Sequence, residues 1–408
     1  MLNLPSPDQI VQRARSLKAA TLDLLVPSQV AQVLATVLTR WRDREFAPRH
    51  ATIVRTAEHL GFSIPLLEES LDALLAPFTR DALAQLAARV VARRELLGFV
   101  MAGNVVGAGL HEVVLGLLAG AGLLVKTASR EPWFFQELAN TLAQEDRRVG
   151  ARLQVSNWSR TRADLTRTLR EVTDELIPYG DDSTIVAVGG RRGAMVGFGS
   201  RLSAALVTRG AARGGGPAQQ VAGCLARDVT LFEQLGCLSP HQIFVECDGE
   251  GDALAFAERL GHAMGELANR LPPPLHLELE DAGALRSVRE TARWRALAGE
   301  RVRAIEGPGL SWVVIFDPDA DLSPAPGLRC VRVSAVRNPA DLAARLAPVH
   351  GKLEAFAIAS NGDNISTIGE VLAASGVSYL AEPGAMQSPP LTWRHGGGWF
   401  LDRMTVGQ

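Results

Sequence analysis

From about Glu95 onward the sequence alternates short apolar segments with helical stretches, and this alternation limits the possible folds more than any other feature. Strands that alternate with helices of roughly 10–15 residues are typical of βαβ units, which form a parallel sheet with helices on both faces. We expect the strands of the first sheet at residues 96–101, 123–126, 153–156, 184–188 and 204–207. The sequence therefore predicts the α/β fold class.

A second α/β block follows the glycine-rich segment 209–217, which is the best candidate for a linker. Its apolar segments predict strands at 242–246, 311–316, 330–334 and 354–359. Apolar side chains recur at helical spacing before residue 93 and predict a helical layer packed on the first α/β domain. The expected parts are an N-terminal helical segment 1–92, a first domain 93–212, a second domain 213–382 and a wrapping tail 383–408.

The charge pattern indicates whether the chain binds nucleic acid, and the cysteines indicate the redox environment in which it works. The 408-residue chain has a formal net charge of −2, and its Lys and Arg residues are scattered, so no nucleic-acid partner is expected. The four cysteines have neither metal-site spacing nor the density of a disulfide framework, which favours a reducing, cytoplasmic environment. The N-terminus does not resemble a signal peptide, and the apolar run 105–125 contains His111 and Glu112, so no membrane span is expected.

Candidate ligand-binding residues follow the expected strands of the first domain. Ligands bind beyond the carboxyl ends of parallel strands, where the loops converge on one edge of the sheet. The residues at this edge are Asn104, Lys126, Thr127, Ser129, Gly189 and Gly190. The glycine-rich turn 102–109 lacks the spacing of a dinucleotide fingerprint, and no acidic residue follows the second strand. Taken alone, the glycines of this turn could serve a nucleotide or could simply allow a helix to pack closely on a strand.

Other classes of site are excluded. The sequence contains neither the phosphate-binding P-loop motif nor the G-x-S-x-G elbow of serine hydrolases. His111 and His262 have no partners at metal-ligand spacing, so no metal site is expected.

One cysteine, Cys237, stands between an expected helix over 218–235 and the expected strand 242–246. We expect Gly236 to end this helix in the left-handed conformation that favours glycine. The corner that follows would hold Cys237 on a loop at the end of a rigid scaffold. A cysteine is more often a small buried hydrophobic residue than a nucleophile, and the spacing alone leaves both interpretations open.

Several segments of the chain match a known family in the same order. The specific ones are Lys-Thr-Ala-Ser-Arg at 126–130 and Gly-Cys-Leu-Ser-Pro at 236–240, whereas the glycine pairs are not specific. The others are Ala102–Gly107, Ile185–Gly189, Ala226–Val229 and Pro383–Gly396. Over about residues 95–400 the chain resembles the acyl-CoA reductase family, the fatty-acid reductase subunit best known from bacterial bioluminescence, which is built on the aldehyde dehydrogenase fold.

The resemblance implies catalytic roles at matching positions. Cys237 would be the nucleophile that forms an acyl-thioester. The side-chain amide of Asn104 would form the oxyanion hole together with the backbone N–H of Cys237. Residues 93–212 would then be the nucleotide-binding domain, and 213–382 the α/β catalytic domain.

The resemblance also implies a site for NADP(H) or NAD(H). Lys126 would reach the adenosine ribose, and Thr127 and Ser129 belong to the same cofactor-binding segment. Gly189 and Gly190 would form the turn that lies against the pyrophosphate.

One departure from aldehyde dehydrogenases bears on the direction of the reaction. Enzymes of that group that hydrolyse their acyl-enzyme use a glutamate in a Glu-Leu-Gly-Gly-Lys segment. The corresponding stretch 197–203 has no carboxylate. The absence of a base that activates water favours thiol exchange and reduction over oxidation to a free acid.

With this resemblance, the sequence predicts NAD(P)H-dependent reduction of a long-chain acyl-CoA, or another activated acyl group, to the aldehyde through acyl-Cys237. One alternative is a CoA-acylating aldehyde dehydrogenase that runs in the oxidative direction. The other is a non-catalytic, acyl-binding relative of the fold. The expected partners are an acyl-CoA or acyl-protein donor, an acyl-protein synthetase and further copies of the chain in a homo-oligomer.

Overall fold

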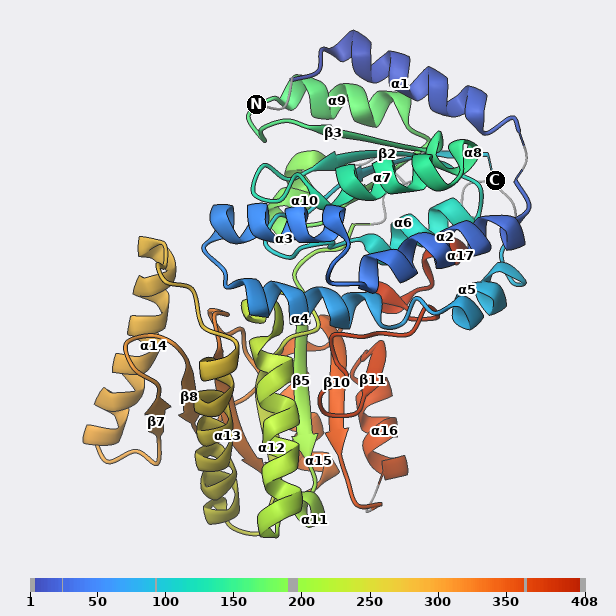
Figure 1. Cartoon of the computed structure of the whole chain (residues 1–408). Helices are drawn as coiled ribbons and strands as arrows, with labels where there is room; N and C mark the ends of the chain where they lie inside the picture. Colours follow the sequence, from blue (N-terminus) through green and yellow to red (C-terminus); the bar gives the residue numbers. More distant parts are fainter. Residues whose placement is uncertain (1–3, 24, 92–93, 190–196, 363–364, 404–408) are drawn as a thin grey trace. The chain divides into compact units, whose positions relative to one another are not determined.

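The computed structural model describes residues 4–23, 25–91, 94–189, 197–362 and 365–403 (Figure 1). The chain divides into two compact units. The first lies within Met1–Leu60, Leu71–Ser200 and Pro390–Gln408, and the second within Gly61–Ser70 and Arg201–Pro389. The structure therefore differs from the expected division at residue 212, since its second unit begins at residue 201.

A four-stranded parallel sheet with the order β3-β2-β1-β4 forms the centre of the first unit. Its strands are β1 (Leu96–Val100), β2 (Gly122–Thr127), β3 (Leu153–Asn157) and β4 (Glu175–Pro178). Every residue of β1 and β2 is buried, as is typical of parallel strands covered on both faces. The expected strands at 96–101, 123–126 and 153–156 are confirmed.

Helices cover both faces of this sheet (Figure 1). The helices that contact its strands are α1 (Pro7–Ala20), α6 (Leu110–Leu118), α7 (Phe134–Glu145), α9 (Ala163–Val172) and α10 (Asp182–Val188). The other described helices of this unit are α2 (Pro27–Arg42), α3 (Ala47–Leu60), α5 (Arg80–Ala87), α8 (Arg147–Gly150), the 3-10 turn η3 (His395–Gly397) and α17 (Phe400–Arg403). α1 and α9 pack on the face that carries Leu96 and Leu124. α6 packs through Gly116 on the opposite face, against Leu97 and Leu123, because successive side chains of a strand alternate. α4 (Ile64–Leu75) belongs partly to each unit.

Residues 184–188 are helical in the structure, as part of α10. The Asp181 carboxylate accepts a hydrogen bond from the Thr184 N–H at 2.6 Å and caps this helix. The place beside β1 is occupied by β4, and Val186 on α10 is 81% exposed. The expected strand at 184–188 is therefore wrong. A run rich in β-branched residues favours a strand, but it does not show whether a neighbouring strand is available to pair with it.

A seven-stranded sheet with the order β11-β10-β5-β6-β9-β8-β7 forms the centre of the second unit. Its strands are β5 (Leu202–Val207), β6 (Pro240–Glu246), β7 (Arg303–Glu306), β8 (Val313–Phe316), β9 (Cys330–Val336), β10 (Leu353–Ala359) and β11 (Tyr379–Ala381). All neighbours are parallel except β7 and β8. The strand expected at 204–207 exists, but its assignment to the first sheet is wrong, because β5 pairs with β6 and β10.

Helices cover both faces of the second sheet as well (Figure 1). The described helices of this unit are α11 (Arg209–Ala212), α12 (Gly215–Thr230), α13 (Glu250–Arg270), α14 (Leu279–Leu297), α15 (Pro339–Leu346) and α16 (Ile365–Ala374), with the 3-10 turns η1 (Leu231–Gln234) and η2 (Ala347–Val349). α12 and α13 lie on one face, and on the other Leu342 of α15 and Leu372 of α16 pack with Phe356. Among the described residues, no helix combines the length and apolar character needed to cross a membrane.

The backbone just before Cys237 has an unusual conformation. Phe232, Glu233 and Gln234 are left-handed, with φ of 55°, 51° and 59°. Gly236 does not have a positive φ, so the expectation of a left-handed glycine cap at this position is wrong. A left-handed residue other than glycine costs roughly 1–3 kcal/mol, which the surrounding contacts must offset.

Candidate active site

Cys237 lies in the second unit, on the loop between η1 and β6, and its side chain is half-buried. Cys247 and Cys330 are buried, and burial raises the pKa of the Cys330 thiol to about 12. Cys224 is half-buried on α12, and burial raises the pKa of its thiol. Reactive cysteines are accessible, which excludes the two buried thiols. Of the two accessible ones, Cys237 lies on a loop three residues before the central strand β6, whereas Cys224 lies within a helix.

The side chain of Gln234 closes the base of the loop that carries Cys237. Its Nε2 donates to the Pro240 carbonyl at 2.8 Å and to the Cys330 carbonyl at 2.7 Å. Its Oε1 accepts from the Cys330 N–H at 2.7 Å. Gln234 and Pro240 stand three residues before and after Cys237, so one buried side chain fixes both ends of the loop.

Ser203 holds the backbone of Cys237 itself. Ser203 is the second residue of β5, and its hydroxyl donates to the Cys237 carbonyl at 2.6 Å. The same oxygen accepts from the Ala355 N–H of β10 at 3.0 Å, so the hydroxyl ties the loop to two strands. Sequence reasoning missed this residue, because a serine inside a strand carries no local signal of a contact with a distant loop.

A segment of the C-terminal tail supports this loop from another side. Gln387 Nε2 donates to Ser239 Oγ at 3.1 Å and to the Asp228 carbonyl at 3.2 Å. The Asp228 carboxylate accepts from the N–H groups of Gly384 at 2.6 Å and Met386 at 3.1 Å. Burial raises the pKa of Asp228 to about 7, although these two donors act to lower it. Two segments that are far apart in sequence thus meet beside the loop.

Asn104 lies in the first unit, half-buried in the turn that follows β1. This turn passes close to the segment after β2. A Cβ on Gly103 would lie 2.6 Å from the Cβ of Ala128 and 3.1 Å from that of Arg130, so only glycine fits here. The carboxyl ends of β1 and β2 therefore bring the turn of Asn104 next to the expected cofactor-binding segment.

Lys126 lies near the end of β2, with only 7% of its surface exposed. Within the described part of the chain, its ammonium group has no hydrogen-bond or ion-pair partner, and burial lowers its pKa. A buried ammonium without acceptors is energetically costly. The hydroxyls or phosphates of a nucleotide would supply the missing acceptors.

The two neighbours of Lys126 in the predicted site differ from each other. Thr127 is fully buried, and its hydroxyl donates to the Ser156 carbonyl at 3.4 Å and accepts from Asn157 Nδ2 at 3.0 Å. Ser129 is exposed in the loop that follows. Thr127 therefore joins the ends of β2 and β3, whereas the Ser129 hydroxyl is accessible to a ligand.

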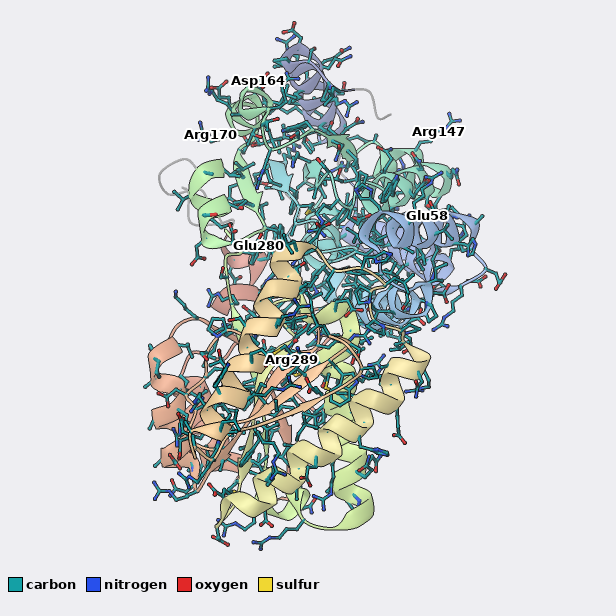
Figure 2. All side chains as sticks on the ribbon, turned by 90° about the vertical axis from the view of Figure 1, so that its left-hand side faces the viewer. Glu58, Arg147, Asp164, Arg170, Glu280 and Arg289 are labelled. Atoms are coloured by element: carbon teal, nitrogen blue, oxygen red, sulfur yellow. The ribbon has the colours of Figure 1, made fainter. Side chains whose placement is uncertain are left out.

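Gly189 ends a helix, α10, with a φ of 57°. Its carbonyl accepts a hydrogen bond from Arg170 Nη1 of α9 at 3.4 Å, and Arg170 is labelled in Figure 2. The expected placement of Gly189 at the carboxyl end of a strand is therefore wrong. Gly190 lies outside the described residues.

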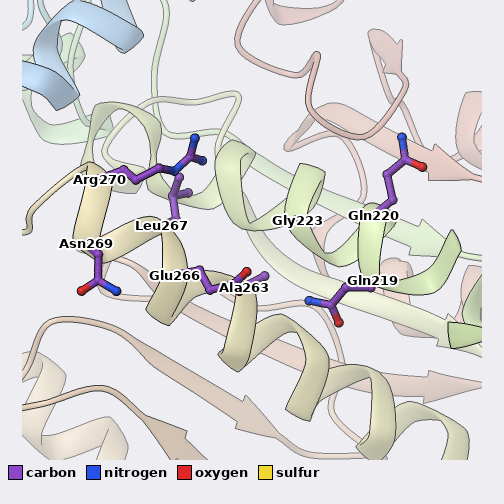
Figure 3. A pocket seen from close by; sticks show the side chains of 8 residues that line it. All are labelled: Gln219, Gln220, Gly223, Ala263, Glu266, Leu267, Asn269 and Arg270. Atoms are coloured by element: carbon purple, nitrogen blue, oxygen red, sulfur yellow. The ribbon is translucent and has the colours of Figure 1, made fainter. Parts of the chain in front are cut away.

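A groove of about 450 Å³ runs between α12 and α13 in the second unit (Figure 3). Five of its eight lining residues have polar side chains: Gln219, Gln220, Glu266, Asn269 and Arg270. None of the predicted site residues lines it, so the groove is not assigned to the reaction.

The first unit contains a buried ion pair that sequence reasoning missed. His395 Nδ1 lies 2.8 Å from Glu112 Oε1, and the His395 ring stacks between Phe198 and Trp393, with centroids 3.9 Å and 4.1 Å away. Burial acts to raise the pKa of Glu112, but the charge and hydrogen bond of His395 outweigh it and lower the pKa to about 2. The pair ties η3 to α6.

We expect Glu112→Gln to lower the free energy of unfolding near pH 7 by roughly 3–5 kcal/mol, because it leaves one partner of a buried pair unmatched. The folded-state pKa of Glu112 lies below its ordinary value of 4.5, so this stabilisation is present above about pH 4.5 and is lost as the pH falls toward 2. Urea denaturation of both proteins across this pH range measures the effect. A difference that does not shrink in acid would contradict the role of the ionised carboxylate.

Comparison with known proteins identifies a family and a fold. A family model described as acyl-CoA reductase (LuxC) matches residues 91–406. The crystal structure of an oxidoreductase from Marinobacter aquaeolei is similar, with a TM-score of 0.74, 13% identity, and coverage of 98% of this chain and 87% of that one. Aldehyde dehydrogenase 21 from Physcomitrella patens has a TM-score of 0.69 and 13% identity, covering 98% and 89%. An indole-3-acetaldehyde dehydrogenase complexed with NAD+ has a TM-score of 0.69 and 12% identity, covering 92% and 80%.

At these low identities the similar structures show the fold alone. They confirm the expected α/β, aldehyde dehydrogenase-like fold with its parallel sheets and covering helices. The search of curated proteins finds no match.

Proposed function

The chain belongs to the acyl-CoA reductase (LuxC) family, and from this premise we propose that it reduces an acyl thioester to the aldehyde. The family and the fold indicate an oxidoreductase that acts on aldehydes or acyl groups. We further propose a long-chain acyl group carried by CoA or by a partner protein, NADPH or NADH as the reductant, and acyl-Cys237 as the intermediate. A similar structure that contains NAD+ supports a nicotinamide cofactor.

Cys237 is proposed to carry the covalent steps. Its thiolate attacks the carbonyl carbon of the donor thioester, the bond to the CoA sulfur breaks, and CoA leaves as a thiolate. Because one thioester replaces another, this exchange is nearly thermoneutral. The nicotinamide, when bound, supplies a hydride to the same carbon. The bond to the Cys237 sulfur then breaks, which releases the aldehyde and returns the cysteine as a thiolate.

One observation carries this proposal: the half-buried Cys237 stands on a loop held by Gln234, by Ser203 and, through Gln387, at Ser239. Fixing the reacting group in place lowers the barrier, since the entropy of positioning is lost before the reaction. The stretch Gly197–Ser203 contributes the Ser203 hydroxyl but no carboxylate to activate water. This absence supports reduction over hydrolysis.

We expect Lys126→Met to raise the KM for the nicotinamide cofactor about 10-fold or more, because a hydrogen bond to a charged group contributes about 1.5–3 kcal/mol. Acylation of Cys237 without nucleotide should stay unchanged. Lys18→Met is the matched control, since Lys18 is an exposed lysine of the same unit, 56% exposed and 3.9 Å from Asp174. Initial rates at varied NADPH and NADH measure the effect. An unchanged KM for both NADPH and NADH would show that Lys126 does not bind the cofactor.

The reaction and its direction are tested by product analysis. The protein is incubated with a long-chain acyl-CoA and either NADPH or NADH, and in a second arm with the aldehyde, NADP+ or NAD+ and CoA. We expect fatty aldehyde to form in step with cofactor oxidation, and faster than the reverse reaction. Activity in the oxidative arm alone would instead indicate a CoA-acylating aldehyde dehydrogenase. Neither aldehyde nor acylated protein would indicate a non-catalytic, acyl-binding relative.

A further inference from the structure

Two left-handed turns meet just before the loop of Cys237. One spans residues 232–234, and the other spans 327–329, where φ is 82°, 54° and 63°. The Leu328 N–H donates to the Glu233 carbonyl at 2.8 Å and joins the two turns. Apart from the glycine at 327, every residue of both turns has a side chain that disfavours this conformation.

A buried ion pair connects the two turns. Arg329 donates from Nε and Nη2 to the two carboxylate oxygens of Glu233, at 2.8 Å and 2.6 Å. The side chain of Glu233 is 0% exposed and that of Arg329 is 1% exposed. Arg329 Nη1 also donates to the Leu271 carbonyl at 2.8 Å. Two parallel hydrogen bonds between a guanidinium and a carboxylate fix both distance and orientation, so the pair sets how the turns lie against each other.

The other residues of the first turn also have buried partners. The Phe232 N–H donates to Ser70 Oγ at 3.0 Å, and Gln234 makes the bonds that close the base of the loop. A strained backbone conformation persists only where surrounding contacts stabilise it, and such conformations are common at functional sites. The left-handed turn 232–234 ends three residues before Cys237, so its strain lies next to the candidate nucleophile.

We propose that the Glu233–Arg329 pair is a positioning device, which keeps 232–234 left-handed and thereby sets the direction from which the Cys237 thiol meets the acyl group. The inference rests on the proposed nucleophilic role of Cys237. Glu233 and Arg329 are positioning residues, because each is buried and bound to the other. A turn relaxed to right-handed geometry would redirect the chain that enters the loop 234–240, and so short a loop has little length to absorb the change.

Two variants separate positioning from stability. Glu233→Gln leaves Arg329 without its anionic partner, so it should lower the melting temperature and slow acylation of Cys237 about 10-fold or more at saturating acyl-CoA, with KM unchanged. The double variant Glu233→Leu/Arg329→Met removes both charges. It should regain most of the melting temperature, because apolar replacement of a buried pair is often neutral, yet its acylation should stay about 10-fold slower.

A control pair in the same unit completes the test. Asp317 forms a 2.6 Å ion pair with Arg295 outside the loop, so Asp317→Asn should change the melting temperature but not the acylation rate. Each protein is assayed for acylation by intact mass and for alkylation of Cys237 by iodoacetamide. A double variant that is acylated and alkylated at the wild-type rates would overturn the positioning role. If even the wild type is never acylated, the proposed function fails, whereas slower alkylation in the double variant would still support the positioning of Cys237.

Discussion

Aldehyde formation should fall roughly 10⁴-fold or more when Cys237 is replaced by serine, because the covalent route then loses its nucleophile. A serine hydroxyl is far less ionised than a thiol near neutral pH, and it would have to form an oxygen ester in place of a thioester. Steady-state rates with acyl-CoA and NADPH measure the loss. The melting temperature should stay close to that of the wild type, since Cys237 is half-buried and its loop is held through backbone groups.

Cys224→Ser is the matched control for this result. It makes the same chemical change at the other half-buried thiol, on α12, and should leave the rate of aldehyde formation unchanged. Cys237→Ser turnover within tenfold of the wild-type rate would contradict covalent catalysis at Cys237.

The second large effect is expected at Asn104. Asn104→Ala should lower kcat about 10²–10³-fold, equivalent to about 2.7–4 kcal/mol of barrier, because it removes one proposed donor to the oxyanion. The KM for acyl-CoA should change little, since the donor acts on charge that develops only during the reaction. Kinetics at varied acyl-CoA separate the two parameters.

Asn140→Ala provides the comparison for this variant. Asn140 is exposed on α7 of the same unit, so its loss should leave kcat unchanged. A kcat for Asn104→Ala within about threefold of the wild type, or a loss that appears only in KM, would exclude Asn104 as an oxyanion donor.

Local sequence predicts the buried strands well, because strands covered on both faces are continuous apolar runs, as at 96–101 and 123–126. The run at 184–188 has the same appearance, yet Asp181 caps a helix there and β4 takes the place beside β1. Sheet membership depends on pairing partners far along the chain. Local sequence therefore detects β5 but does not show which sheet it joins.

The buried ion pairs cannot be predicted from local sequence either, because the partners of each pair lie far apart along the chain. Glu233 and Arg329 are 96 positions apart, and Glu112 and His395 are 283 apart. The left-handed turn consists of residues other than glycine, so a sequence rule that seeks a glycine cap selects Gly236 instead. Local sequence locates the ends of β1 and β2 but not the end of α10, where the sequence pattern predicts a strand. The positions of Asn104 and Lys126 near the ends of β1 and β2 follow from local sequence, whereas the contacts around them do not, and their roles stay predictions.

The central claim is that an acyl group passes through Cys237, and intact-mass spectrometry after incubation with a long-chain acyl-CoA, without nucleotide, tests it most directly. We expect a mass increase of one acyl group on the peptide that contains Cys237. The increase should be absent from Cys237→Ser and should be discharged as aldehyde when NADPH or NADH is added. Acylation that persists in Cys237→Ser, or an adduct that neither reduced cofactor discharges, would contradict the claim.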